Sequence, residues 1–216
     1  MARRASPARD PDEFPISAHS RTRLLDAALE LFDERGIDAT SARAVGTAAG
    51  HRNVAAVSYH FGDMRSLLRA VLHRQQGPLD ARRHALLDAL EATGKVTPHA
   101  AIDAMFAPHV ELLASPDGRR FLRVLNQTAN HPTWYPEAAP EVWSSNQRGV
   151  LHLLPLWDHL DPDVQVQRAL MAFGLCSFAL AERSRLLDTP EPPRTIVPED
   201  VFREDLVTVM ERVLGA

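Results

Sequence analysis

The chain has 216 residues, of which 45% are hydrophobic and 24% charged, and its formal net charge is −4 at pH 7. This composition is typical of one or two folded domains with an apolar core. No run of eighteen or more apolar residues occurs, so we expect no transmembrane helix. The single cysteine, Cys176, excludes an internal disulfide framework and indicates a cytoplasmic protein.

Residues 1–18 are rich in Arg, Pro and Ala and lack a periodic apolar pattern, which predicts an arm without regular structure. Arg3, Arg4 and Arg9 leave two interpretations open. The arm is a solvated tail, which we favour, or it enters a minor groove as basic arms of other DNA-binding proteins do.

A first helix is expected after the arm. Ser20 can act as its N-cap, an apolar stripe gives it a buried face, and Gly36 ends it.

Residues 40–61 contain no Asp or Glu, and the nearest acidic residues are Asp38 and Asp63. A surface that lies against phosphates is built in this way, because a carboxylate there would repel the nucleic acid. The net charge does not argue against such a surface, since an acidic domain elsewhere can mask a local basic face. The stretch therefore predicts a contact with DNA.

Two short helical patterns lie within this stretch. Thr40 or Ser41 can cap the first, which ends at Gly50. Asn53 can cap the second, whose buried face includes Val57. Two short helices joined at a glycine predict a helix-turn-helix whose second helix reads DNA.

Motifs spread over residues 22–72 resemble the N-terminal domain of the tetracycline repressor (TetR) family of bacterial transcriptional regulators. They are LDAALELF at 25–32, Arg35-Gly36, TSAR at 40–43, Ala48-Ala49-Gly50, VSYHFG at 57–62 and Leu67-Leu68. The turn after Gly50 is one residue longer than is usual in the family, and Met64 stands where the family often has a lysine. The resemblance implies an all-α protein with an N-terminal three-helix DNA-binding domain and a C-terminal helical domain for ligand binding and dimerisation.

The resemblance and the outward positions of the two helices give the expected DNA contacts. Four of them match positions that contact the DNA backbone in the family: Thr40, Arg43, Tyr59 and His60. The remaining expected contacts, to bases or from the turn, are Ser41, His51, Arg52, Asn53, Ala55, Ala56 and Ser58. Small outward residues allow a helix to approach base edges closely.

The remainder of the chain predicts helices and no convincing strands. The expected segments are 66–75, ended by Gly77-Pro78, then 79–93, 98–114, 117–130, 141–156, 163–187 and a last helix opened by Pro198. We expect the DNA-binding domain to span 19–64 and the C-terminal domain 65–216. In the family the helix that begins near residue 66 transmits ligand binding to the DNA-binding heads.

The last two helices carry more apolar surface than one subunit can cover. The residues expected in a homodimer interface are Leu170, Phe178, Phe202, Leu206, Val209 and Val213. Two such helices from each subunit would form a four-helix bundle across a two-fold axis. A dimer of this kind is expected to bind a palindromic double-stranded operator.

The C-terminal domain is also expected to bind a small lipophilic effector. Its candidate contacts are Phe106, Leu122, Leu125, Asn126, Asn130, Trp134, Trp143 and Phe173. His99 and Asp103 lie four residues apart on one helix, but no third ligand follows at a recognisable spacing, so we expect no metal site and no cofactor.

These patterns favour a ligand-released repressor. Two alternatives stay open: a DNA-binding or helical interaction protein without sequence specificity or effector, and, with less support, an enzyme on a helical bundle. Against the enzyme, the sequence has no nucleophile elbow, P-loop, dinucleotide-binding glycine pattern or zinc spacing.

Overall fold

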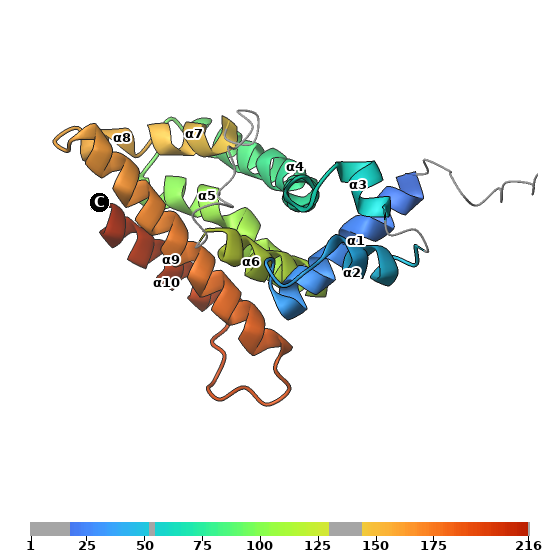
Figure 1. The fold of residues 1–216 in the computed structure, drawn as a ribbon. Coiled ribbons are helices and arrows are strands. Elements are labelled where there is room, and N and C mark those ends of the chain that lie inside the picture. The colour runs from blue at the N-terminus through green and yellow to red at the C-terminus, as the bar shows by residue number, and fades with distance from the viewer. Residues whose placement is uncertain (1–17, 52–54, 130–143, 216) are drawn as a thin grey trace, which may run out of the picture.

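The computed structural model describes residues 18–51, 55–129 and 144–215, and within these ranges every regular element is helical (Figure 1). The predicted all-α class is confirmed. The elements are α1 (Ala18–Arg35), α2 (Ala42–Ala48), α3 (Ala56–Phe61), α4 (Met64–Glu91), α5 (Pro98–Glu111), η2 (Leu112–Ala114), α6 (Pro116–Ala129), α7 (Ser144–Leu151), α8 (Leu154–Trp157), α9 (Pro162–Asp188) and α10 (Glu199–Leu214). The expected N-terminal arm lies outside the described residues, apart from Ala18.

The buried apolar residues of the described ranges form two clusters. The first joins α1, α2, α3 and the N-terminal half of α4 around Phe32 and Leu67, and it also includes Phe121 of α6. The second joins α5 to α10 around Trp157 and Met210. Because α6 contributes to both clusters, it lies between the helix-turn-helix and the C-terminal bundle (Figure 1). The domain boundary at residues 64 and 65 stays a prediction.

The expected helix end at Gly77-Pro78 is wrong, because α4 runs unbroken from Met64 to Glu91. Pro78 lacks the N–H that would bond the carbonyl of Arg74, so the helix gives up one hydrogen bond. Gly77 removes the other obstacle, since it has no Cβ to clash with the proline ring. Buried Leu72 and Leu79 on either side of the pair hold both halves against the core.

The other helix boundaries agree with the sequence to within a few residues, with two exceptions. The segment 141–156 was expected to be one helix, but its described part consists of α7 and α8, with Pro155 in the first turn of α8, a position that suits proline. Ser20 was expected to be the N-cap of α1, but the helix begins at Ala18 and Ser20 is buried in its first turn. Pro198 was expected in the first turn of the last helix, and it lies one residue earlier, as the N-cap residue of α10.

The residues considered for a metal site have other partners in the fold. The Nδ1 of His99 lies 3.1 Å from Oε2 of Glu211. The carboxylate of Asp103 accepts two hydrogen bonds of 2.6 Å from Arg203. Both contacts join α5 to α10, and the described residues contain no group of three side chains able to hold a metal ion.

By length and composition, α9 is long and apolar enough to cross a membrane. Core helices of folded proteins meet the same criteria, so this is weak evidence for a membrane protein. Figure 1 shows α9 crossing α6 and lying beside α10, and its buried residues include Cys176, Leu180 and Ala181. One face of α9 therefore belongs to the core, while its other face carries exposed apolar side chains.

Candidate nucleic-acid interface

Helices α2 and α3 form a helix-turn-helix against α1. The Oγ of Ser41 caps α2 by accepting a 3.2 Å hydrogen bond from the N–H of Ala44, as predicted. Gly50 ends α2 with a φ of 76°, a conformation that residues with a Cβ rarely adopt. Val45 and Val57 are fully buried and fix the two short helices against the core.

Thr40 anchors the turn before α2. Its hydroxyl donates to the carbonyl oxygens of Gly36 at 2.8 Å and Leu31 at 3.2 Å, and its side chain is buried. The hydroxyl is thus already engaged within the protein, so any DNA contact at this position falls to the main chain. Arg43, one turn into α2, is exposed.

On α3, Ser58 and Tyr59 are exposed, with 54% of Tyr59 accessible to solvent. The His60 ring packs edge-to-face against Tyr59 with a centroid separation of 5.2 Å. This contact restrains the phenol ring, so Tyr59 is presented to a ligand with part of its rotational freedom already removed.

Ala56 corrects an expectation. It was predicted to point outward beside Ala55, but it packs in the first apolar cluster while Ala55 is exposed. The first two residues of the helix, Ala56 and Val57, both face the core, and its exposed positions begin at Ser58. Arg52 and Asn53, including the expected N-cap role of Asn53, lie outside the described residues.

Two histidines meet at one serine beside the turn. The Oγ of Ser20 lies 3.1 Å from Nε2 of His51 and 3.3 Å from Nε2 of His60. Burial, the nearby Arg23 charge and the His60 ring lower the pKa of His51 below its usual value of 6.5. His51 is therefore neutral at neutral pH and offers hydrogen bonds rather than charge.

The N-terminal end of α1 places two arginines beside the turn that were not among the expected DNA contacts. Arg21 lies over the Phe61 ring at 4.9 Å, and the guanidinium of Arg23 reaches Gly50. Both arginines are exposed beside the turn. A signal was present in the sequence: no acidic residue occurs between Glu13 and Asp26, a second acid-free stretch like that of residues 40–61.

The acid-free surface ends at the start of α4. Asp63 caps this helix, and its Oδ1 accepts a 2.7 Å hydrogen bond from the N–H of Ser66. That bond, together with the Ser66 hydroxyl, lowers the pKa of Asp63. Met64 packs against the first apolar cluster, while Arg65 is exposed. The positive charge that a lysine at position 64 would supply is therefore present one residue later, on Arg65.

The residues expected to bind an effector do not form one group. Phe106 and Leu122 belong to the second apolar cluster, whereas Leu125 and Phe173 pack in the first. Asn126 is buried and accepts a 3.5 Å hydrogen bond from Ser177. Asn130, Trp134 and Trp143 lie outside the described residues.

The residues expected at a dimer interface also separate into two kinds. Leu170, Phe178 and Val209 are exposed, as an interface with a second subunit needs. Leu206 is buried, and Phe202 and Val213 pack partly buried against the same subunit's core. Residues of α9 that were not among the expected interface residues extend the exposed apolar face: Val166, Met171 and Leu175.

Comparison with known proteins identifies the helix-turn-helix. Residues 24–71 match the model of the bacterial regulatory proteins of the tetR family. This segment therefore belongs to the TetR family. It is the DNA-binding domain of a transcriptional regulator, as the motifs of residues 22–72 predicted. No curated protein sequence matches the chain.

Solved structures resemble the chain over nearly its full length. The fatty acid degradation regulator FadR from Bacillus halodurans has a TM-score of 0.56 and 13% identity, covering 94% of this chain and 97% of its own. NalD, the secondary repressor of the MexAB-OprM multidrug efflux pump in Pseudomonas aeruginosa, has a TM-score of 0.49 and 22% identity, covering 89% and 94%. PfmR from Thermus thermophilus has a TM-score of 0.46 and 20% identity, covering 86% and 96%. At these identities, the similarity to FadR establishes a shared fold alone.

Proposed function

We propose that this TetR-family regulator is a homodimeric repressor that binds an inverted-repeat operator and leaves it when a small molecule binds the C-terminal domain. The observation that supports the dimer is the exposed apolar face of α9. Its members are Val166, Leu170, Met171, Leu175 and Phe178. A contiguous apolar face of this kind favours contact with a second copy, and α9 with α10 from each subunit would complete a four-helix bundle.

The dimer defines the form of the operator. A single α3 has an outward surface of only a few residues and reads few base pairs. Two copies related by a two-fold axis read two inverted half-sites about one helical turn apart. On each half-site, Arg43, Tyr59 and His60 contact the backbone, and Ala55 and Ser58 approach the bases.

A lipophilic effector is supported by the apolar character of the second cluster, with Phe106 and Leu122 as candidate contacts. Release from DNA requires that the effector bind more tightly to a conformation whose heads are wrongly spaced for the operator. We place this regulator in the cytoplasm, where its operator is, and assign it no enzymatic activity.

The proposal is tested by selecting bound duplexes from a random pool with the purified full-length protein at near-physiological salt. A palindromic consensus is expected, together with a stoichiometry of two chains per duplex. Binding without sequence enrichment by a folded dimer would overturn the proposal and favour the non-specific DNA-binding alternative. An asymmetric site bound by one chain would overturn the dimer.

A further inference from the structure

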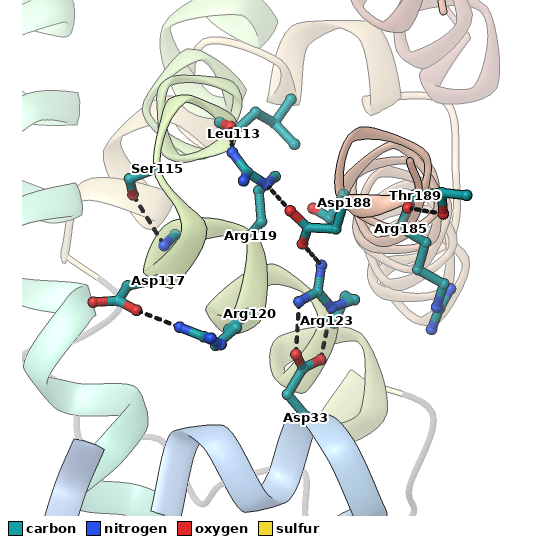
Figure 2. A network of polar contacts seen from close by, with 12 residues as sticks. Asp33, Leu113, Ser115, Asp117, Arg119, Arg120, Arg123, Arg185, Asp188 and Thr189 are labelled. Carbon is teal, nitrogen blue, oxygen red and sulfur yellow. Dashed lines mark hydrogen bonds and ion pairs between the residues drawn. The ribbon is translucent and has the colours of Figure 1, made fainter. Parts of the chain in front are cut away.

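One face of α6 carries three polar side chains four residues apart: Arg119, Arg123 and Gln127. This spacing aligns them along the helix. Figure 2 shows that α6 lies between Asp33, near the end of α1, and Asp188, the last residue of α9. This polar face of α6 therefore contacts both α1 of the DNA-binding domain and α9, the helix whose other side is apolar and exposed.

Arg123 binds both neighbours at once. Its Nε and Nη2 donate to the two carboxylate oxygens of Asp33, each at 2.6 Å. Its Nη1 donates to Oδ2 of Asp188, also at 2.6 Å. The side chains of Arg123 and Asp33 are only 12% and 13% exposed, so solvent screens this bidentate ion pair little. The Nε of Arg119 holds the other carboxylate oxygen of Asp188 at 2.6 Å.

Gln127 binds the main chain where α1 gives way to the turn before α2. Its Oε1 accepts from the N–H of Ile37 at 3.1 Å, and its Nε2 donates to the carbonyl of Phe32 at 3.0 Å. Both groups lie at the C-terminal end of α1, where the Phe32 carbonyl also accepts from the N–H of Gly36 at 3.1 Å. Gly36, with a φ of 87°, lets the chain turn so that the N–H of Ile37 meets the amide.

Within the described ranges, a second residue of α1 forms an ion pair with another helix, and this pair is more exposed. Arg74 of α4 contacts Asp26 of α1 at 2.6 Å, with 30% and 61% of the two side chains exposed. Exposed pairs are screened and hold their partners weakly. Among the described residues, the polar contacts that hold α1 most firmly are therefore those of α6.

We propose that Arg123 and Gln127 are positioning residues for DNA recognition, which fix the orientation of the helix-turn-helix relative to α9 and so set the half-site spacing that the dimer accepts. The inference rests on the proposed function, because half-site spacing has a meaning only for a dimer on a two-part operator. The two-fold axis makes the two DNA-binding domains equivalent, so a substitution that loosens one loosens the other equally. A small loss of restraint in each subunit therefore widens the range of half-site spacings that the dimer binds.

The test measures the affinity of the full-length protein for the selected operator and for duplexes whose half-site spacing is changed by one or two base pairs. Each base pair rotates one half-site by about 35° relative to the other. The wild-type protein is expected to lose affinity about tenfold for a change of one base pair, which is the size of one poor base contact. The variant carrying Arg123→Gln and Gln127→Met is expected to lose less than about threefold on the same scale.

Arg120→Gln is the matched control. Arg120 lies on the same helix, but its ion pair is with Asp117 of α6 itself. This variant should keep the wild-type spacing profile. Gln127→Met alone keeps the Arg123 ion pairs and the side-chain volume, so it gives a folded variant with intermediate broadening if the double variant does not fold.

Two results would overturn the proposal, and they are distinguishable. In the first, the wild-type protein has a narrow spacing optimum and the folded variants keep it. This result would show that Arg123 and Gln127 do not position the helix-turn-helix, and it would leave the proposed function intact. In the second, the wild-type dimer binds duplexes of all half-site spacings equally. This result would contradict both the positioning role and the two-part operator.

Discussion

At the scale of single residues, Arg43 offers the most direct test of the interface. It is exposed on α2 within the acid-free surface and has no ion-pair partner among those found in the described residues. Arg43→Ala should weaken binding to the operator and to random duplex by a similar factor, and it should lower the slope of log affinity against log salt by about 1.8, which is about 0.9 for each of the two copies in the dimer. Fluorescence anisotropy over a salt series measures both.

Arg120→Ala serves as the control for Arg43, since it removes the same charge from α6. An Arg43 variant with the wild-type salt slope would exclude Arg43 from the phosphate contacts.

His109 makes stability depend on pH. It is buried on α5, and its Nδ1 has no hydrogen-bond partner among the described residues. Burial, and to a smaller extent the Arg83 charge, lower the pKa of His109 from 6.5 to about 3. As pH falls from 6.5 towards 3, this histidine is protonated in the unfolded chain but stays neutral in the native state. The free energy of unfolding therefore decreases by at most about 1.4 kcal/mol per pH unit.

His109→Phe should therefore reduce the acid sensitivity of the fold. Urea unfolding at several pH values between 6.5 and 4 should give a shallower decline in the free energy of unfolding than for the wild-type protein. The exposed His159→Gln is the control and should keep the wild-type slope. An identical slope in the His109 variant would mean that this imidazole is protonated in the native state.

At the scale of helices, α4 depends on packing to continue through Pro78. Pro78→Ala restores an N–H for the Arg74 carbonyl, and it should raise the free energy of unfolding by about 1–2 kcal/mol after the greater freedom of the unfolded chain is subtracted. Urea unfolding monitored by circular dichroism measures the change. Pro98→Ala is the control, because Pro98 lies in the first turn of α5, where proline costs no hydrogen bond. A destabilised Pro78 variant would show that the interruption itself favours the native packing.

The same helix shows why local sequence signals misplaced a boundary. Gly77-Pro78 is a common stop signal, and it predicted two helices where there is one. Glycine and proline within a helix destabilise it by about 1–3 kcal/mol. Burial of the leucines on both sides of the pair stabilises the continuous helix and offsets this cost. In α2, where Ser41 and Gly50 act through contacts within one turn of the chain, the same kind of reasoning placed both ends.

At the scale of the whole molecule, the exposed face of α9 should hold the dimer together. Phe178 is 54% exposed on that face, so Phe178→Glu places a charge against the partner's apolar side chains. Sedimentation velocity should show a folded monomer, and operator affinity should fall by about a hundredfold or more, since a monomer reads one half-site. Leu151→Glu, at an exposed apolar position on α7, is the control and should stay dimeric. A dimeric Phe178 variant would move the interface elsewhere.

The sequence by itself determined the helical class, the helix-turn-helix and its acid-free surface. These features follow from local rules: helical periodicity over one or two turns, caps, a glycine in a left-handed turn, and the absence of carboxylates from a short stretch. Arg43 and Tyr59 could be assigned to the exposed surface because each lies on a helix whose buried face is visible in the sequence.

Only the tertiary structure decided which distant residues meet. Arg123 and Asp33 are 90 positions apart, and no local pattern relates them. Ser20 was read as a cap because its partners, His51 and His60, lie in other elements. Leu206 resembled an interface residue, yet the same subunit covers it. Periodicity states that a helix face is apolar, whereas the neighbour that covers the face depends on how the helices pack in three dimensions.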